Sequence, residues 1–503
     1  MIGTSSKKRT FLLIPSIPTP NGKLHLGHIA GPFLKMDVIK RFNQQVGNEV
    51  FLYGGTDVHD SYVVLKASME LKPVEDICWY YHNLINDDLK KMSIEFDLFL
   101  NPLDVEYCSN YTNTTQKLFY DLETKARVAC RTETYPFSHK RGFLAASFIH
   151  GECPICQSKM SGFICEQCGI SHKPEEIQRK HYKLNDVEEK KIRSYFLPIN
   201  GSAILNELSR IKLPLYMKKI LKAYLKEKND FRITVPTFWG VGTKHGSVFY
   251  NYGTFFAYCY VLSDIFCRKQ KTLFMNAFMK GSEVETVASF GFDNISTFAI
   301  GTLNYALTLG PSYKGFDFYL PNQFMTLNGD KFSTSRNHAI WVDKIKPSVS
   351  IDIVRLFLLK NNPDSHRSDF KVSEFIAFYN EISCSLNRHF SFKEKGIIRK
   401  TNETRLRTTY HQNINCMMPE NYSGRRIYKQ LMAWISCNEG GEVWLKGFSV
   451  IAYPVMPNLS LLIWQSVLNQ KGIPSLEAFR PQPLSLENLN RISLISNDDI
   501  EVG

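Results

Sequence analysis

Two histidines, His25 and His28, stand three residues apart in the stretch His25-Leu26-Gly27-His28. An apolar run and a turn-rich segment precede this stretch and a helical pattern follows it, which predicts a strand, a tight turn and a helix. A helix N-terminus suits a phosphate, and Gly27 leaves room for a ligand beside the backbone. Two imidazole donors on one turn could serve nucleotidyl transfer, or they could be surface or capping histidines.

A second polar cluster contains Asp57 and follows the apolar run at residues 50–53. Ligands bind at the carboxyl ends of strands in doubly wound sheets, so Asp57 could bind an amino group there, or it could cap a helix. Later in the chain, Lys331 and Arg336 flank three hydroxyl residues in a glycine-containing loop over residues 321–337. This loop could clamp a triphosphate, or it could be an ordinary basic surface turn.

Four of the twelve cysteines form two Cys-x-x-Cys knuckles. In a cytosolic chain this pattern predicts zinc, and the alternatives are a redox pair or a lost metal. Four thiolates leave no open position on the metal, so the role should be structural. The expected ligands are Cys153, Cys156, Cys165 and Cys168.

The elements that must position these residues alternate between strands and helices up to the cysteine knuckles, which interrupt the α/β pattern like an insertion. Strand-like stretches at Val248–Tyr250 and Thr297–Ala299 predict the second half of the sheet. After Asp352 the chain reads mostly helical. Residues 393–425 are polar and irregular, which predicts a linker or a flexible region.

The net charge and the distribution of apolar residues limit which partners and which cellular compartment we expect. The net charge of +13 favours a polyanionic partner or substrate without naming one. No apolar run is long enough to span a membrane. A basic N-terminus followed by an apolar run faintly imitates a signal peptide, but two prolines and the missing cleavage site argue against one, so we expect a cytoplasmic protein.

Taken in order, these motifs resemble one family. Residues 18–28 resemble the HIGH signature of class I aminoacyl-tRNA synthetases, and Lys331-Phe332-Ser333-Thr334-Ser335 resembles their KMSKS loop. The segments 55–59 and 336–342 and the cysteine knuckles are similar to archaeal-type methionyl-tRNA synthetases. The resemblance runs from about residue 10 to residue 390, and its departures indicate a divergent paralogue.

The resemblance implies an α/β fold: a Rossmann-type (HUP-like) catalytic domain with a zinc-ribbon insertion and an α-helical C-terminal domain. The expected boundaries are 1–115 for the first Rossmann half, 116–235 for the connective insertion with its ribbon at 153–168, 236–325 for the second half, 326–390 for the stem-contact region, and 391–503 for a reduced anticodon-binding-like helical domain.

The resemblance also implies that an amino-acid carboxylate attacks the α-phosphate of ATP in line and expels pyrophosphate, normally with Mg²⁺. Histidines 25 and 28 would stabilise the α-phosphate, Lys331 and Arg336 would hold pyrophosphate, and Asp57 would pair with the substrate ammonium. Thr334 stands where the loop usually has its second lysine. The expected ATP-binding residues are His25, Gly27, His28, Lys331, Ser333, Thr334 and Ser335.

The amino-acid pocket departs from the family. Thr19 stands at a tyrosine and Tyr252 at a tryptophan. Phe255 and Phe256 stand at an Ala-Pro pair, so large residues replace small ones, and Phe298 stands at a histidine, so a polar residue becomes apolar. We therefore expect a small amino acid such as glycine, alanine or serine as substrate, while the alternative is a repacked pocket that still takes methionine. The expected substrate-binding residues are Ile17, Pro18, Thr19, Asp57, Tyr252, Phe255, Phe256, Asp293 and Phe298.

Two functions follow from the resemblance. In the first, the ligase passes its aminoacyl group to a small-molecule nucleophile in specialised (natural product) metabolism, by analogy with the synthetase-like half of hydrazine-forming enzymes; a separate cupin-like partner protein would then be needed. In the second, the protein is an aminoacyl-tRNA ligase that charges tRNA, such as a methionine–tRNA ligase. The expected partners are ATP, an amino acid and, in the second case, tRNA; no membrane is expected.

Overall fold

A five-stranded parallel sheet forms the centre of the molecule. The computed structural model describes residues 8–332, 337–391, 399–400 and 403–503. The strand order in the sheet is β14-β13-β1-β2-β3, and every pair is parallel. The strands are β1 (Thr10–Pro15), β2 (Glu49–Gly55), β3 (Leu98–Leu100), β13 (Val284–Gly291) and β14 (Phe318–Asn322).

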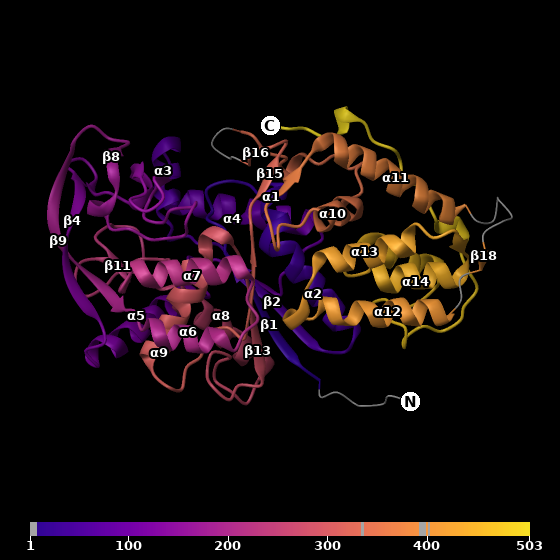
Figure 1. Cartoon of the computed structure of the whole chain (residues 1–503), viewed down its shortest axis with the longest axis horizontal. Helices are drawn as coiled ribbons and strands as arrows, with labels where there is room; N and C mark the ends of the chain where they lie inside the picture. Colours follow the sequence, from indigo (N-terminus) through magenta and orange to yellow (C-terminus); the bar gives the residue numbers. More distant parts are fainter. Residues whose placement is uncertain (1–7, 333–336, 392–398, 401–402) are drawn as a thin grey trace.

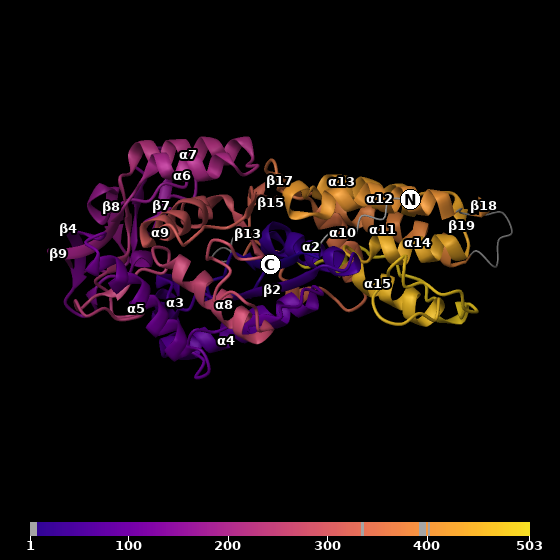
Figure 2. The ribbon, with the colours of Figure 1, turned by 90° about the horizontal axis from the view of Figure 1, so that it is seen from below.

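Both faces of this sheet are buried, which explains the nearly continuous apolar run of β1. Successive residues of β1 enter different cores: Leu13 belongs to the core shared with the C-terminal helices, whereas Leu12 and Ile14 belong to the core beneath α5 (Cys108–Thr124) and α8 (Phe255–Gln270). Figures 1 and 2 show the sheet between these two groups of elements.

The second half of the sheet lies elsewhere in the sequence than predicted. The stretch near Val248–Tyr250 does form β12 (Val248–Phe249), but it pairs antiparallel with β11 (Thr234–Val235), outside the central sheet. The prediction for Thr297–Ala299 is wrong, because these residues lie in a π-helical segment, Ser296–Gly301. A short apolar run does not distinguish a buried strand from a buried helical turn.

An insertion follows α5, and its longest element is an antiparallel pair of strands. Its strands are β4 (Ala129–Ser138) and β9 (Val187–Pro198), and they pair without a break from Ala129 with Phe196 to Ser138 with Val187. The cysteine ribbon lies between them in the chain, in a small sheet of β6 (Ile149–Glu152), β7 (Lys159–Ser161) and β8 (Gln178–Tyr182). The helices α6 (Gly201–Ser209) and α7 (Leu215–Glu227) complete the insertion (Figure 1).

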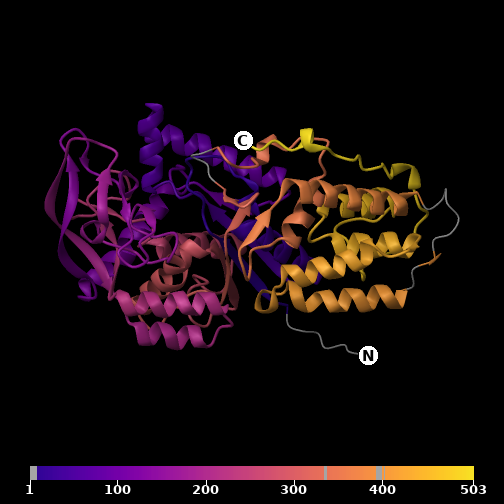
Figure 3. The same ribbon diagram turned by 45° about the horizontal axis from the view of Figure 1, so that its top comes forward.

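Helices dominate the chain after residue 350, as predicted. They are α10 (Ile351–Lys360), α11 (Val372–Phe390), α12 (Glu403–Met417), α13 (Gly424–Ile435), α14 (Glu442–Ala452) and α15 (Pro457–Leu462), and Figure 3 shows α11 to α14 side by side. The prediction of an irregular linker over 393–425 is wrong for α12, which buries Leu406 and Tyr410 one turn apart on one face. Among the described residues, no helix is both long and apolar enough to span a bilayer.

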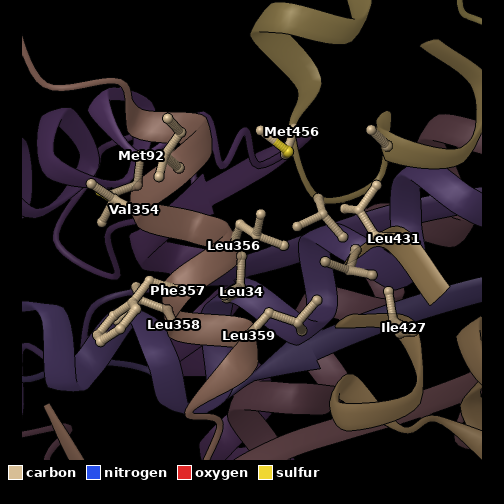
Figure 4. Close-up of a cluster of buried hydrophobic side chains, with 14 of the residues drawn as sticks. Leu34, Met92, Val354, Leu356, Phe357, Leu358, Leu359, Ile427, Leu431 and Met456 are labelled. Carbon is tan, nitrogen blue, oxygen red and sulfur yellow. The ribbon is translucent and has the colours of Figure 1, made fainter. Parts of the chain in front are cut away.

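The C-terminal helices pack directly on the elements around the central sheet. Leu34 of α2 (Leu34–Gln45) and Met92 meet Leu356 of α10 and Met456 in one apolar cluster (Figure 4). Beside this cluster, the fully buried Arg355 Nη2 donates to Asp37 Oδ2 over 2.6 Å. Removing one partner of a buried ion pair lowers the free energy of unfolding by several kcal/mol, because the other charge is left buried and unpaired. The Arg355–Asp37 pair therefore holds the two regions in one arrangement.

Candidate functional site

The His25–His28 stretch begins the first helix after β1, as the sequence predicts. His25 is the N-cap residue of α1 (Leu26–His28), and the two imidazole rings stack with centroids 3.7 Å apart. His25 Nδ1 accepts the His28 backbone N–H over 3.3 Å, and His28 Nδ1 accepts the His25 N–H over 3.3 Å. The ring of His28 thus gives the His25 N–H an acceptor at the start of the helix, while the His28 N–H is shared between the His25 ring and the His25 carbonyl oxygen, 2.9 Å away.

The cap also decides which ring nitrogen can serve a ligand. Because both Nδ1 atoms accept hydrogen bonds from backbone N–H groups, these bonds favour the tautomer in which each neutral ring carries its proton on Nε2 and can donate from there. Burial lowers the pKa of His28 to about 4. Burial first, and then the neighbouring His28 and Lys331 charges, lower the pKa of His25 well below its usual value. Near pH 7 the pair therefore offers two neutral Nε2–H donors.

The loop that carries Lys331 lies against this pair. Phe332 stacks on the His25 ring at 4.8 Å, and a Cβ added to Gly27 would come within 3.1 Å of Phe332 Cδ2. A glycine at position 27 therefore favours the close approach of these two segments, because a side chain there would have to displace the Phe332 ring slightly. The expected site residues Ser333, Thr334, Ser335 and Arg336 lie outside the described residues.

Lys331 itself forms an ion pair with Glu166, which stands between Cys165 and Cys168 in the second cysteine knuckle. The Lys331 ammonium lies 5.8 Å from the centroid of the Phe324 ring. The ribbon thus reaches across to the loop beside the histidine pair. Nothing in the sequence spacing pointed to this contact, because 165 residues separate Glu166 from Lys331.

Asp57 stands just beyond the carboxyl end of β2, as expected. Its backbone N–H donates to Pro18 O over 3.0 Å, and its Oδ2 accepts from Asn251 Nδ2 over 2.6 Å. Burial first, and then the negative charge of Asp60, raise the pKa of Asp57 to about 8. A cation bound beside such a carboxyl group would stabilise its ionised form and lower its pKa.

Asp60 is a functional candidate that the sequence reasoning missed. It is the N-cap residue of α3 (Ser61–Glu70), and its carboxylate is 1% exposed. Its Oδ2 accepts from Thr19 Oγ1 over 3.0 Å and from Tyr252 OH over 2.9 Å. The available signal was an aspartate directly before a helical pattern, which indicates only a cap.

Aromatic rings fill the side of the site next to α8. The rings of Phe255 and Phe298 lie 4.4 Å apart, and Phe290 stacks on Phe298 at 4.6 Å. Both Phe255 and Phe298 are buried, and Ile17 packs against the same core. Tyr258 points at the end of β2, where its hydroxyl donates to Thr56 O over 3.4 Å.

Two of the expected substrate-binding residues, Phe256 and Asp293, do not lie among the contacts described above. Phe256 is 1% exposed and stacks on Tyr305 at 5.6 Å, so its ring faces the core beneath α8. Asp293 is partly buried, and its Oδ1 accepts from Asn294 Nδ2 over 3.3 Å. Burial, and then the Glu166 charge, raise the pKa of Asp293 to about 6, so the second cysteine knuckle faces Asp293 as well as Lys331.

The four predicted zinc ligands come together. The Sγ atoms of Cys153 and Cys168 lie 3.7 Å apart, those of Cys156 and Cys165 lie 3.5 Å apart, and all four lie within 4.8 Å of one another. A tetrahedral zinc with Zn–S bonds of about 2.3 Å requires sulfur separations of this size, so the donor set fits a closed structural site.

One buried histidine adjoins the cysteine cluster. His172 Nε2 lies 3.3 Å from Cys153 Sγ, and the His172 side chain is 1% exposed. On its other side, His172 Nδ1 lies 3.7 Å from a carboxylate oxygen of Glu176. A histidine in this position can orient the thiolate of a bound metal without being a ligand.

Comparison with known proteins places these features in a family context. The sequence model of the family described as tRNA synthetases class I (M) matches residues 11–386. The methionine–tRNA ligase of Dehalococcoides mccartyi (strain CBDB1) is 28% identical over 382 residues, which cover 72% of this chain and 67% of that relative. The methionine–tRNA ligase of Chlamydia pneumoniae is 23% identical over 542 residues, covering 97% of this chain and 94% of that one.

Solved structures have the same fold. The Mycobacterium tuberculosis methionyl-tRNA synthetase in complex with methionyl-adenylate superposes with a TM-score of 0.70 at 15% identity, over 95% of this chain and 98% of that one. The apo form of the same synthetase superposes with a TM-score of 0.64 at 14% identity. The predicted α/β architecture with a cysteine-ribbon insertion and a helical C-terminal region is confirmed.

Proposed function

Because the chain belongs to the class I tRNA synthetases of the M group, ligases that activate amino acids with ATP, we propose that it adenylates a small amino acid such as glycine, alanine or serine instead of methionine. The observation that carries this proposal is the contact between Phe255 and Phe298, whose rings lie 4.4 Å apart in the wall where a longer side chain would need space. A pocket filled by side chains excludes long substrates sterically.

On the ATP side, the reaction needs donors that meet negative charge as it develops on phosphate. A carboxylate oxygen of the amino acid attacks the α-phosphorus, a new P–O bond forms, and the bond to the β-phosphate breaks as pyrophosphate leaves with the electron pair. The Nε2–H groups of His25 and His28 would donate to the α-phosphate, and Lys331 would exchange its Glu166 partner for pyrophosphate. Mg²⁺ bound with ATP would neutralise part of the phosphate charge.

On the amino-acid side, Asp57 would bind the substrate ammonium. Its Oδ2 is fixed by Asn251, and its backbone N–H by Pro18 O, so the carboxylate is held in place before a substrate arrives. An ammonium beside it would stabilise the ionised carboxylate against the charge of Asp60. The amino acid would then be oriented by its backbone groups, which every amino acid shares, whatever the size of its side chain.

The test is ATP–pyrophosphate exchange against all twenty amino acids, without tRNA. We expect exchange with one or more of glycine, alanine and serine, and at least about tenfold less with methionine, because a methylene in a tight apolar pocket is worth about 10- to 200-fold. Strong exchange with methionine and none with the small amino acids would overturn the proposal.

For the acceptor, we propose a small-molecule nucleophile. The proposal rests on the departures of the pocket from the family pattern, and a cupin-like partner protein stays a prediction from the resemblance. The alternative acceptor is tRNA, which the names of the relatives and the net charge of +13 favour. Hydroxylamine traps any aminoacyl adenylate and so reports activation alone, which makes total tRNA the deciding acceptor. We expect no transfer of the labelled amino acid to tRNA; charging of tRNA would establish the alternative.

A further inference from the structure

A single carboxylate oxygen connects two walls of the amino-acid site. Asp60 Oδ2 accepts from the hydroxyl of Thr19, in the turn before the histidine pair, over 3.0 Å, and from the hydroxyl of Tyr252, in the segment before α8, over 2.9 Å. In sequence, 41 residues separate Asp60 from Thr19 and 192 residues separate it from Tyr252. Both partners are residues that we place at the substrate.

The hydrogen-bonding capacity of Asp60 is already used by the protein. Its Oδ1 accepts the Tyr62 backbone N–H over 2.9 Å and lies 3.5 Å from Ser61 Oγ, while Oδ2 holds the two wall hydroxyls. An ionised carboxylate offers about four acceptor positions, so Asp60 is occupied by the chain itself. Asp60 therefore acts through its neighbours, whereas the adjacent Asp57 is the group proposed to meet the substrate.

A cap for α3 would not need these contacts. Capping uses one oxygen and the Tyr62 N–H, and serine or asparagine does it as well as aspartate. The second oxygen and its two hydroxyl partners are additional, and Asp60 is only 1% exposed, so its hydrogen bonds to the partly buried Thr19 and Tyr252 are shielded from water. The arrangement thus points to a task in the site beyond ending a helix.

We propose that Asp60 is a specificity-determining positioning residue: it joins Thr19 and Tyr252 and so closes the side-chain end of the amino-acid site. The inference rests on the proposed function, because it explains how a small substrate is selected. The shared acceptor oxygen holds the Thr19 and Tyr252 side chains together across the site. The negative charge of Asp60 also strengthens the attraction of the neighbouring Asp57 for an ammonium.

The decisive variant is Asp60→Ser, because serine still caps α3 but is too short to reach both hydroxyls. We expect the ratio of kcat/KM for norvaline over that for the best small amino acid to rise about tenfold or more, mainly through KM. Asp60→Asn retains an acceptor oxygen and the cap, and should stay closer to the wild type. Asn200→Ser changes the N-cap of α6, away from the site, and should leave the ratio unchanged.

Two readouts separate the possible failures. If the wild type itself activates methionine as well as any small amino acid, the proposed function fails, and the closed wall fails with it. If the wild type selects a small amino acid, and Asp60→Ser melts like the wild type with an unchanged ratio, only the present inference is overturned. Should Asp60→Ser not fold, Tyr252→Phe leaves the cap intact and removes one of the two bonds; an unchanged ratio there overturns the inference equally.

Discussion

The two proposed ends of the site, one for ATP and one for the amino acid, are built from different kinds of contact. At the ATP end, His25 and His28 form a reciprocal cap whose geometry comes from one helical turn, and Gly27 leaves space for Phe332. At the amino-acid end, aromatic rings and a buried carboxylate from distant segments fill the wall. The first end resembles the family in its residues, whereas the second resembles it mainly in its fold.

This difference is consistent with the proposal that the chain keeps the chemistry of the family and takes a different amino acid. Phosphate recognition by ring and backbone donors does not depend on which amino acid is activated. Selection among amino acids depends on the volume left between side chains such as Phe255 and Phe298, which can change without disturbing the ATP end. Variants at each end should therefore have separable effects.

The largest effect is expected at the ATP end. His28→Asn keeps an acceptor near the position of Nδ1 and removes the Nε2–H donor, so exchange should fall about 100- to 1,000-fold in kcat with every amino acid that the wild type uses. ATP–pyrophosphate exchange measures the loss. The exposed His366 provides a matched control, since His366→Asn should have no effect. A near-wild-type rate for His28→Asn would remove this histidine from the chemistry.

A somewhat smaller effect, confined to the amino-acid end, is expected at Asp57. Below about pH 8 the carboxyl group is largely protonated in the free protein, so kcat/KM for the amino acid should rise as the pH increases towards 8. Asp57→Asn should raise KM about 10- to 100-fold and abolish this rise, because a neutral amide pairs weakly with ammonium at every pH. KM for ATP should change little.

The same group gives a stability test with a definite sign. The pKa of Asp57 is raised in the folded protein from 3.8 to about 8, so its neutral form stabilises the fold fully below about pH 4, and this contribution is lost as the pH rises through 8. The melting temperature of the wild type should fall relative to that of Asp57→Asn over this window. A constant difference in melting temperature between the two proteins from pH 5 to pH 9 would show that the pKa of Asp57 is not raised in the folded protein.

The cysteine ribbon offers a test that leaves both ends intact. His172→Ala removes the group 3.3 Å from Cys153 Sγ, and the affinity for zinc should fall about 10- to 100-fold. Competition with a chromogenic chelator measures the change, and His139→Ala, at an exposed residue in the same insertion, is the control. Equal zinc affinity in both variants would show that His172 does not orient the Cys153 thiolate.

The smallest effect is expected where the ribbon meets the ATP end. Glu166 and Lys331 are more than half exposed, so their ion pair is worth at most about 1 kcal/mol. Glu166→Gln should lower KM for pyrophosphate up to about fivefold at low salt, because Lys331 no longer has to leave the Glu166 carboxylate. The difference should vanish at high salt. Glu152→Gln, which breaks an ion pair with Arg179 in the ribbon, controls for charge alone.

Much of this molecule could be predicted from the sequence, because the relevant residues are close together in the chain. Three-residue spacing places His25 and His28 on one turn, and two Cys-x-x-Cys pairs determine a cluster of four thiols. The apolar runs at β1 and β2 likewise predict buried parallel strands. In each case local backbone geometry limits the outcome to few arrangements.

Tertiary structure decided the rest. The contacts of Asp60 with Thr19 and Tyr252, and of Glu166 with Lys331, join segments that no local spacing relates. The misplaced strand at Thr297–Ala299 has the same cause, since burial alone does not choose between strand and helical turn. Side-chain packing between distant segments depends on the whole fold, and the wall proposed to select the substrate is built from those contacts.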